Sequence, residues 1–552
     1  MRRGTRERSR GIRPGLLVFG AALVVAAAAA AAAFVLRTSG SERPVLPTSA
    51  ELVEGVAGSW QRVNPLYASL NEVDGDLAAL VFSGLVKLGP DGSVQPDLAE
   101  ALPEISADGR TYTFRIRPDA RWHDGEPVTS FDVAFTIEQI RAPDFRGDPL
   151  LAEAWSTVKV ETPDERTVIL ELEAPNAPFL ARFATIGILP AHLLRGLSGQ
   201  ALYDAPFNAA PIGSGPYRVA SLTDEEAVLE ANAAYHLGRP GIDRIRIRFF
   251  NDYSAGLAAL DAGEIDSLLV REPLTDAQAV AVQELSGVNV YQLPRAAYVV
   301  LYLNNAQAAT FQDPRVRQAV SLALDRERIV EEVFHGAARP SSSPIPPGSW
   351  AYVPEYDRTE PDIARAQELL AAAGWRPHPT TGTLVREGEE FRITIRTDND
   401  PFRVAVAEEV ARQLDAIGIR ATVASTTFAV LRRDFLQQRR YEAAVAGWDQ
   451  GADPDPYAGW HSSQMGSAGL NIANTNDAVI DRLIETARTR HDPAVRKEMY
   501  RQLQEVWQSV MPSAILFYPA YTYLVRSDVQ VVLPEILPTP AGRFAFVEEW
   551  RR

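Results

Sequence analysis

The chain has 552 residues, of which 46% are hydrophobic and 23% charged, a composition typical of a globular protein rather than a disordered or fibrous one. It contains no cysteine, which excludes disulfide bonds, thiol nucleophiles, cysteine-ligated zinc, iron–sulfur clusters and a lipid-modified N-terminal cysteine. The formal net charge is −16, and such an acidic chain does not suit nucleic acid, whose phosphates need a basic surface.

The N-terminus predicts a membrane segment. Residues 1–15 contain six arginines and form a basic, cytoplasmic segment, and Leu16–Leu36 follows with 21 residues and no charge. About 20 apolar residues suffice to cross a bilayer, and the arginines before them keep the N-terminus inside and the rest of the chain outside. The alternative is a cleaved signal peptide, since the alanine run offers many cleavage sites. Residues 37–50 are rich in Ser, Thr and Pro and are interpreted as a linker.

Strands and helices alternate irregularly along the rest of the chain. Polar–apolar alternation and apolar runs predict strands at Thr111–Arg117, Thr167–Glu173, Ile242–Phe250, Tyr298–Asn304, Phe391–Thr397, Ile419–Ala424 and Ala514–Tyr518. Helical periodicity predicts helices at Pro314–Phe334, Pro361–Ala373, Phe402–Ile417, Ala478–Thr489 and Pro493–Val510. Asp313 and Asp492 each precede a proline and are expected to be N-caps, while Gly374 and Gly418 are expected to end helices. This mixture predicts an α/β or α+β protein with more than one lobe.

The chain carries no catalytic motif. It has no G-x-S-x-G elbow, no H-E-x-x-H among its seven histidines and no phosphate-binding loop, because no glycine is followed by lysine. Ser156 and Lys159 match S-x-x-K, but the accompanying K-T-G is absent, and Ser156–Val160 is interpreted as a strand. We therefore expect no catalytic residue, no metal site and no cofactor.

Aromatic and acidic residues gather instead in one segment. After the apolar run Ala443–Ala446, the stretch Gly447–Trp460 contains two tryptophans, one tyrosine and three aspartates, punctuated by proline and glycine. Loops on a rigid scaffold are where binding residues concentrate, and tryptophan offers an apolar wall while aspartate accepts a cation. The alternative is that the tryptophans fill the core beneath the loop and the aspartates cap turns.

An ordered series of motifs carries a resemblance to a known family. Within Val81–Ile137 the sequence reads F-S-G-L, then P-D-L-A-E, then D-G-R-T-Y-T-F-R-I-R, then W-H-D-G-E-P-V-T-S-F-D-V. Asn64–Leu66 (N-P-L) precedes this segment, and further motifs follow it in order, namely Pro211–Tyr217 (P-I-G-S-G-P-Y), Leu303–Asn305, Val316–Ala319, Ala323–Arg326, Leu369–Gly374 and Gly447–Trp448. The chain resembles the family 5 extracytoplasmic solute-binding proteins of ABC importers, over roughly residues 51–552.

The resemblance implies a hinged, two-lobed periplasmic-binding-protein-like (type II) α/β fold with a third, inserted domain. Carried over by motif order, lobe one is expected at residues 51–88, 206–290 and 521–552, the inserted domain at 89–205, and lobe two at 291–520. The ligand pocket is expected between the lobes, where concave sites form, and closure is expected to be a hinge movement.

The same resemblance indicates the candidate ligand-binding residues. They are Trp448, Asp449, Asp453, Tyr457, Tyr298, Arg396 and Asn64. Tyr298 is alternatively ordinary strand packing, and Arg396, a possible partner of a carboxylate, is alternatively a solvated strand end. The peptide binders of the family hold the ligand ammonium with an aspartate three residues after the tryptophan, where this chain has Gly451, so Asp449 or Asp453 is expected to take that role.

The expected function is that of the binding subunit of an ABC importer, which captures a small ligand and delivers it to the permease. A peptide is the first candidate, and sugars, nickel chelates and other amphiphiles stay open. We expect a monomer that contacts the permease subunits and, through its N-terminal helix, the membrane, but not nucleic acid. The alternatives are an anchored ligand sensor with the same fold and an extracytoplasmic hydrolase.

Overall fold

The computed structural model describes residues 50–552. The predicted membrane segment Leu16–Leu36 and the linker up to residue 49 lie outside the described residues. Among residues 50–552, no helix is both long and apolar enough to cross a membrane.

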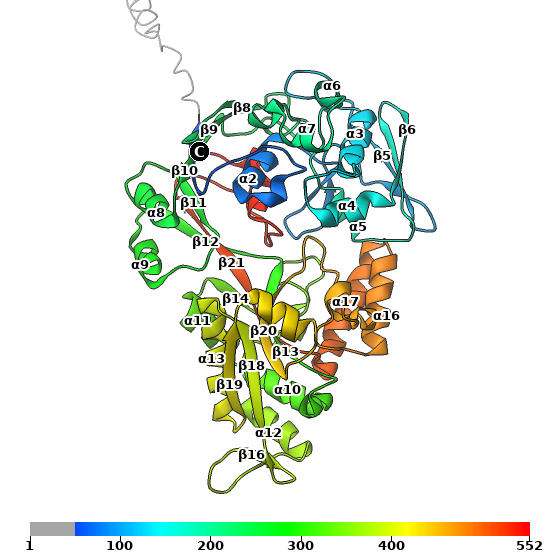
Figure 1. Cartoon of the computed structure of the whole chain (residues 1–552). Coiled ribbons are helices and arrows are strands. Elements are labelled where there is room, and N and C mark those ends of the chain that lie inside the picture. Colours follow the sequence, from blue (N-terminus) through cyan, green and yellow to red (C-terminus); the bar gives the residue numbers. More distant parts are fainter. Residues whose placement is uncertain (1–49) are drawn as a thin grey trace, which may run out of the picture. The chain divides into compact units, whose positions relative to one another are not determined.

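One mixed sheet of twelve strands organises residues 50–552 (Figure 1). Lobe one is the part built on β1 (Glu51–Ala57), β8 (Tyr217–Leu222), β9 (Glu226–Ala231), β10 (Arg244–Phe250), β11 (Ser267–Val270) and β12 (Val288–Pro294). Lobe two is the part built on β13 (Ala297–Leu303), β14 (Ala338–Pro340), β18 (Arg392–Asp398), β19 (Arg420–Thr426) and β20 (Ala443–Asp449). The chain therefore has the two-lobed α/β architecture that the motifs imply.

A single long strand joins the two lobes. β21 (Ala514–Arg526) pairs with β13 and β14 through its first half and with β11 and β12 through its second half. The sequence analysis ends this strand at Tyr518, but the apolar and aromatic pattern continues to Val525, and the strand runs on with it. The expected lobe boundary at residues 520 and 521 falls inside β21.

Residues 89–205, which the resemblance assigns to the inserted domain, contain a separate antiparallel sheet in the order β4-β5-β7-β6. Its strands are β4 (Glu104–Ile105), β5 (Thr111–Arg115), β6 (Lys159–Asp164) and β7 (Thr167–Glu171), and its helices include α3 (Ser130–Ile140), α4 (Pro149–Ser156) and α5 (Phe179–Phe183). The predicted strand at Ser156–Val160 is wrong in its first part, because Ser156 ends α4, and the strand β6 begins only at Lys159. Asp148 caps this helix by accepting a hydrogen bond from the Leu150 N–H, and the buried Trp155 anchors it.

In lobe two, the helices α16 (Ala478–Thr489) and α17 (Pro493–Val510) have the predicted bounds. The bounds of α12 (Ile363–Ala372) and α13 (Pro401–Ala416) lie within two residues of the predicted bounds. Asp313 and Asp492 cap helices as expected, and Gly374 and Gly418 follow helix ends with φ of 91° and 90°.

The predicted single helix Pro314–Phe334 is wrong. It is divided into α10 (Pro314–Leu322) and α11 (Arg326–Phe334), and Asp325 caps the second helix. The buried Arg326 guanidinium donates hydrogen bonds to the carbonyl oxygens of Ser321 and Leu324 at the break.

The core of lobe two lies on both faces of its sheet. Alternate residues of β13 enter different hydrophobic clusters: Val299, Leu301 and Leu303 pack on one face, and Tyr298, Val300 and Tyr302 on the other. A strand covered on both faces needs apolar side chains at every position, which explains the unbroken apolar run of β13.

Two of the sequence motifs meet in space. His123, from the W-H-D-G segment, makes hydrogen bonds to Gly215 O through Nε2 (3.1 Å) and to Gly213 N through Nδ1 (3.2 Å). Burial lowers the pKa of His123 to about 4, so the ring is neutral and serves as donor and acceptor at once. Gly213 admits no side chain, because a Cβ there would lie 1.9 Å from Val81 O.

Candidate functional site

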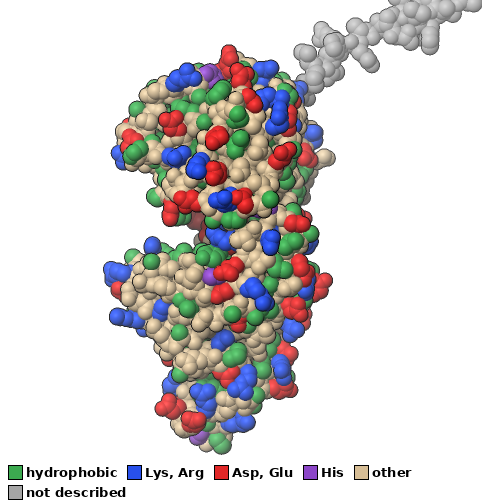
Figure 2. Space-filling model, turned by 90° about the vertical axis from the view of Figure 1, so that its right-hand side faces the viewer, with side chains coloured by type: hydrophobic (Ala, Val, Ile, Leu, Met, Phe, Trp, Pro, Cys, Tyr) green, Lys and Arg blue, Asp and Glu red, His purple; other side chains and the backbone are tan. Residues whose placement is uncertain are grey.

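The lobes are joined by two chain crossings, β21 and the connection Pro294–Ala297 between β12 and β13. The Arg295 N–H donates to Pro519 O (2.8 Å), which holds the two crossings side by side. The Leu537 N–H donates to Pro294 O (2.8 Å) and ties the C-terminal segment to the same connection. Figure 2 shows the surface hollowed between the upper part of the molecule, which contains lobe one, and the lower part, which contains lobe two. This hollow lies between the lobes, where the sequence predicts the ligand pocket.

Trp448 and Asp449 lie at the end of β20, next to the crossings. The sequence predicts a loop at these two residues, but β20 continues to Asp449, which is the Cα partner of Ala297 on β13. Trp448 is half-buried, and a Cβ on Gly459 would meet its indole at 3.4 Å, so Gly459 supports one side of the ring. The Asp449 side chain is exposed, and its Oδ1 accepts a hydrogen bond from the Gly451 N–H (2.9 Å).

The other tryptophan of the segment has a different environment. Trp460 is fully buried, edge-on to Trp507, and its Nε1 donates to the Tyr298 hydroxyl (2.7 Å). The core-filling alternative therefore describes Trp460, whereas Trp448 keeps an accessible face.

Asp453 is buried and paired inside lobe two. Its carboxylate accepts hydrogen bonds from the Arg496 guanidinium on α17 at 2.8 and 3.0 Å, and the pKa of Arg496 is raised because Asp453 opposes the cost of burial. Asp455, two residues on, pairs with Arg488 of α16 at 2.8 Å. Both aspartates thus hold the segment 450–456 onto the α16–α17 helix pair.

The structure does not bring the remaining predicted residues together. Tyr298 and Asn64 are almost completely buried, and Asn64 donates through its amide to the Asn208 Oδ1 (2.9 Å), far from Tyr298 in the chain and on the other lobe. Arg396 lies on β18 with its guanidinium 3.8 Å from the centre of the Phe435 ring. Their contact with a ligand stays a prediction.

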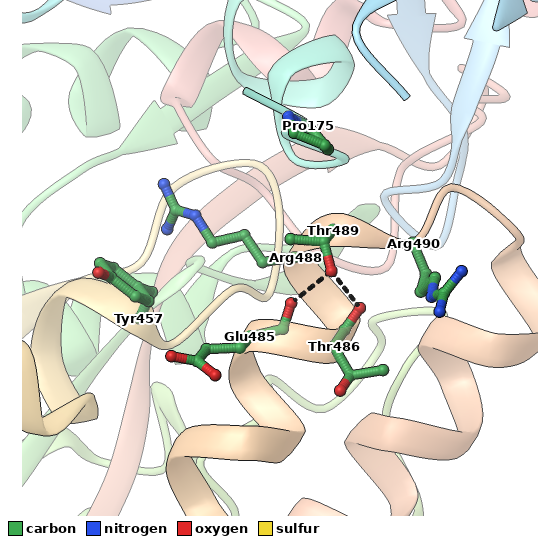
Figure 3. A pocket seen from close by; sticks show the side chains of 7 residues that line it. All are labelled: Pro175, Tyr457, Glu485, Thr486, Arg488, Thr489 and Arg490. Atoms are coloured by element: carbon green, nitrogen blue, oxygen red, sulfur yellow. Dashed lines mark hydrogen bonds between the residues drawn. The ribbon is translucent and has the colours of Figure 1, made fainter. Parts of the chain in front are cut away.

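Tyr457 lines a pocket of about 540 Å³ between α16 and the inserted domain. Figure 3 shows Arg488 reaching from α16 toward Tyr457, with Pro175 of the inserted domain on the opposite wall. The Tyr457 ring stacks with His461 (centroids 4.6 Å apart) and carries the Arg488 guanidinium at 4.3 Å. These neighbours take up much of the ring surface, and the hydroxyl bonds with Ser463 (3.0 Å).

One residue that shapes the site is missed by the sequence analysis. Arg182, on α5 of the inserted domain, donates to the carbonyl oxygens of Gln450 (3.1 Å) and Asp455 (3.2 Å) and so holds both ends of the segment that follows Trp448 and Asp449. The partners are separated by about 270 residues, and no local pattern marks Arg182 as special.

The comparisons with known proteins agree with this architecture. Residues 93–469 match the family described as bacterial extracellular solute-binding proteins, family 5 Middle. The oligopeptide-binding protein AppA of Bacillus subtilis (strain 168) is 30% identical over 480 residues, which are 85% of this chain and 86% of AppA.

Solved structures match over the same extent. The structure of AppA in complex with a nonapeptide is 27% identical with a TM-score of 0.61, covering 91% of this chain and 98% of that one. The structure of NikZ from Campylobacter jejuni in complex with Ni(L-His) is also 27% identical, with a TM-score of 0.64 and coverage of 91% and 99%.

Proposed function

Since the chain belongs to the bacterial extracellular solute-binding proteins of family 5, we propose that the solute it captures between its lobes is a peptide. Membership of this family makes the chain the extracytoplasmic solute-binding subunit of an ABC importer. The peptide assignment is supported by the name of its Bacillus subtilis relative, an oligopeptide-binding protein whose solved structure holds a nonapeptide.

The observation that carries the proposal is the pair Trp448–Asp449 at the cleft end of β20. The accessible face of Trp448 provides an apolar wall for a side chain or backbone stretch, and the exposed Asp449 carboxylate provides an acceptor for the N-terminal ammonium. The Asp453 carboxylate is already paired with the Arg496 guanidinium. Asp449 is therefore the better placed of the two aspartates to accept the ligand ammonium, which Gly451 has no side chain to bind.

We further propose that the expected division into lobe one (51–88, 206–290, 521–552), inserted domain (89–205) and lobe two (291–520) describes the bodies that move. Ligand contacts from both lobes stabilise the closed state, which is how a hinge closes around a ligand. The protein binds without reacting, and this is supported by the absence of catalytic motifs and by relatives that are named for binding.

The test is calorimetric titration of residues 50–552 with di-, tri- and tetrapeptides, beside mono- and disaccharides and Ni(L-His) as non-peptide probes. We expect saturable binding of at least one peptide class and recovery of that peptide chemically unchanged, checked by mass spectrometry. Binding of the saccharides or the nickel complex with no binding of any peptide refutes the assignment, and multiple-turnover conversion refutes binding without reaction.

A further inference from the structure

The inserted domain and lobe one share one hydrophobic core. A single cluster of buried side chains contains Leu52 and Tyr523 of lobe one together with Tyr112, Trp155 and Phe179 of the inserted domain. Among the described residues, the clusters of lobe two contain no residue of either part. Because a close-packed core holds its elements together, lobe two is the part that can turn relative to the other two.

Lobe two is attached to this common body in two separate places. The first is the pair of chain crossings, β21 and the connection Pro294–Ala297. The second is the contact between α16 and the inserted domain, which lies to the right of β21 in Figure 1 and is seen from close by in Figure 3. Lobe two therefore cannot turn about the crossings unless the second attachment separates.

The second attachment, which we term the latch, is polar. Its hydrogen bonds all end on backbone carbonyl oxygens and run from Arg182 to Gln450 (3.1 Å) and Asp455 (3.2 Å), from the Ala177 N–H to Arg488 (2.8 Å), and from His491 Nε2 to Gly109 (3.0 Å). Polar interfaces of this kind are typical of domains that move relative to one another.

The latch leaves part of its hydrogen-bonding capacity unused. Arg182 Nε and Gln450 Oε1 are buried, and neither has a partner among the described residues. The same holds for Oδ1 of Asn176, the neighbour of Ala177. An unpaired buried polar atom costs free energy, which contact with water recovers when the surfaces part. The stabilisation from the latch bonds is therefore partly offset, so the latch is able to open.

The latch also reaches the candidate ligand site. Segment 449–455 begins at Asp449, beside the chain crossings, and Arg182 binds the carbonyl oxygen of its last residue, Asp455. Trp448 directly precedes this segment. The positions of Trp448 and Asp449 thus depend on both attachments of lobe two.

We propose that the latch holds the ligand-free protein in a binding-ready arrangement, with lobe two kept against the inserted domain and Trp448 and Asp449 kept in place. Arg182 is the positioning residue, and it acts on the ligand through segment 449–455. Opening of the latch lets lobe two turn about the crossings and lowers the ligand affinity. The conformational part stands apart from the proposed function, and only the effect on affinity rests on it.

The chain has no cysteine, so two introduced cysteines take spin labels at chosen positions only. Glu153→Cys on α4 and Lys497→Cys on α17 place exposed labels on the two sides of the latch. Double electron–electron resonance on the full-length protein measures the distance between them. Without ligand we expect one narrow distance distribution, which Arg182→Met moves to longer distances. Arg182→Lys keeps a charged donor and is expected to restore part of the short distance.

The same variants are then titrated with trialanine and tetraalanine. Arg182→Met is expected to weaken binding about tenfold, the effect of reducing the binding-ready fraction to about a tenth. Saturating peptide is expected to return the labels to the wild-type distance, because a ligand that binds one arrangement better shifts the population toward it.

Arg117→Met is the matched control. Arg117 is also a half-buried arginine of the inserted domain that donates to a backbone carbonyl oxygen, Asp97 O at 2.7 Å, but this bond stays within one body. Label distance and affinity are expected to stay those of the wild type. His491→Phe removes another latch bond, keeps an aromatic ring against Tyr112, and serves if Arg182→Met does not fold.

The outcomes separate this inference from the proposed function. Unchanged label distances in Arg182→Met and His491→Phe overturn the inference, and so does an equal lengthening in Arg117→Met. Longer distances with unchanged peptide affinity overturn the link between the latch and the ligand site. If the wild-type protein binds neither peptide, the result counts against the proposed function, and the label distances still decide whether the latch holds lobe two.

Discussion

Two aspartates four residues apart have opposite roles because of what surrounds them. Asp449 is exposed at the end of β20 and free to meet a ligand, while Asp453 is 2% exposed and paired with Arg496. A buried carboxylate whose partner is also buried is costly to neutralise, because the remaining charge loses its compensation.

Asp453→Asn is expected to lower the free energy of unfolding by about 3–5 kcal/mol, because it leaves the Arg496 guanidinium buried without a counter-ion. Asp449→Asn, the matched control, makes the same change at an exposed position and is expected to leave stability within about 0.5 kcal/mol. Urea denaturation of both variants measures the difference. Equal stabilities would mean that Arg496 is not held by Asp453.

Trp448→Ala is expected to weaken peptide binding by about one to two orders of magnitude, the usual effect of truncating an aromatic anchor. Thermal unfolding is expected to change little, because Trp448 is half-buried beside Gly459 and is not enclosed by core. Trp448→Phe keeps an aromatic wall and should retain most of the affinity. If Trp448→Ala unfolds, the side chain fills the core instead of lining the pocket. If the peptide affinity is unchanged, Trp448 does not contact the ligand.

At the scale of elements, His123 links two turns whose motifs lie about 90 residues apart. Its pKa of about 4 in the folded protein lies below the ordinary value of 6.5, so the unfolded chain binds more protons between these pH values. Stability from this site is therefore fully present above about pH 6.5 and is lost as the pH falls toward 4.

His123→Gln offers a matched donor and acceptor without a titration. We expect the wild-type protein to lose stability relative to His123→Gln between pH 7 and pH 5, by on the order of 1–2 kcal/mol at 1.36 kcal/mol per pH unit. Denaturant unfolding at the two pH values checks this. A stability difference between the two proteins that does not change with pH would show that the ring titrates normally.

For the whole molecule, the inserted domain adds a second connection across the cleft. Besides Arg182, it contacts lobe two where the Ala177 N–H donates to Arg488 O (2.8 Å) and where His491 Nε2 bonds with Gly109 O (3.0 Å). A hinge movement that separates the inserted domain from lobe two must break these hydrogen bonds, whereas any other movement keeps the two parts together. These contacts therefore limit how the lobes reorient.

The topology of the whole chain is a prediction of the N-terminal sequence. With Leu16–Leu36 behind six arginines, protease added to intact cells is expected to digest the body from residue 50 onward, and fractionation is expected to recover the full-length chain with the membrane. Protection of the body until lysis would refute the topology. Release of a shortened chain into the soluble fraction would favour the cleaved signal peptide.

The sequence by itself determined the features that depend on nearby residues and on motif order. The bounds of α16 and α17 and the caps Asp313 and Asp492 follow from periodicity and from a side chain reaching a backbone N–H two or three residues away. The ordered motifs determined the family, and with it the two-lobed fold, because a long composite pattern is specific.

Only the tertiary structure decided which of these residues are buried and which stay accessible. Asp449 and Asp453, or Trp448 and Trp460, cannot be told apart locally, since their burial depends on Arg496, Gly459 and Trp507 being brought to them by the fold. Arg182 has no sequence signature at all. Its role comes from a contact with a segment about 270 residues away, and such a contact exists only once the chain has folded.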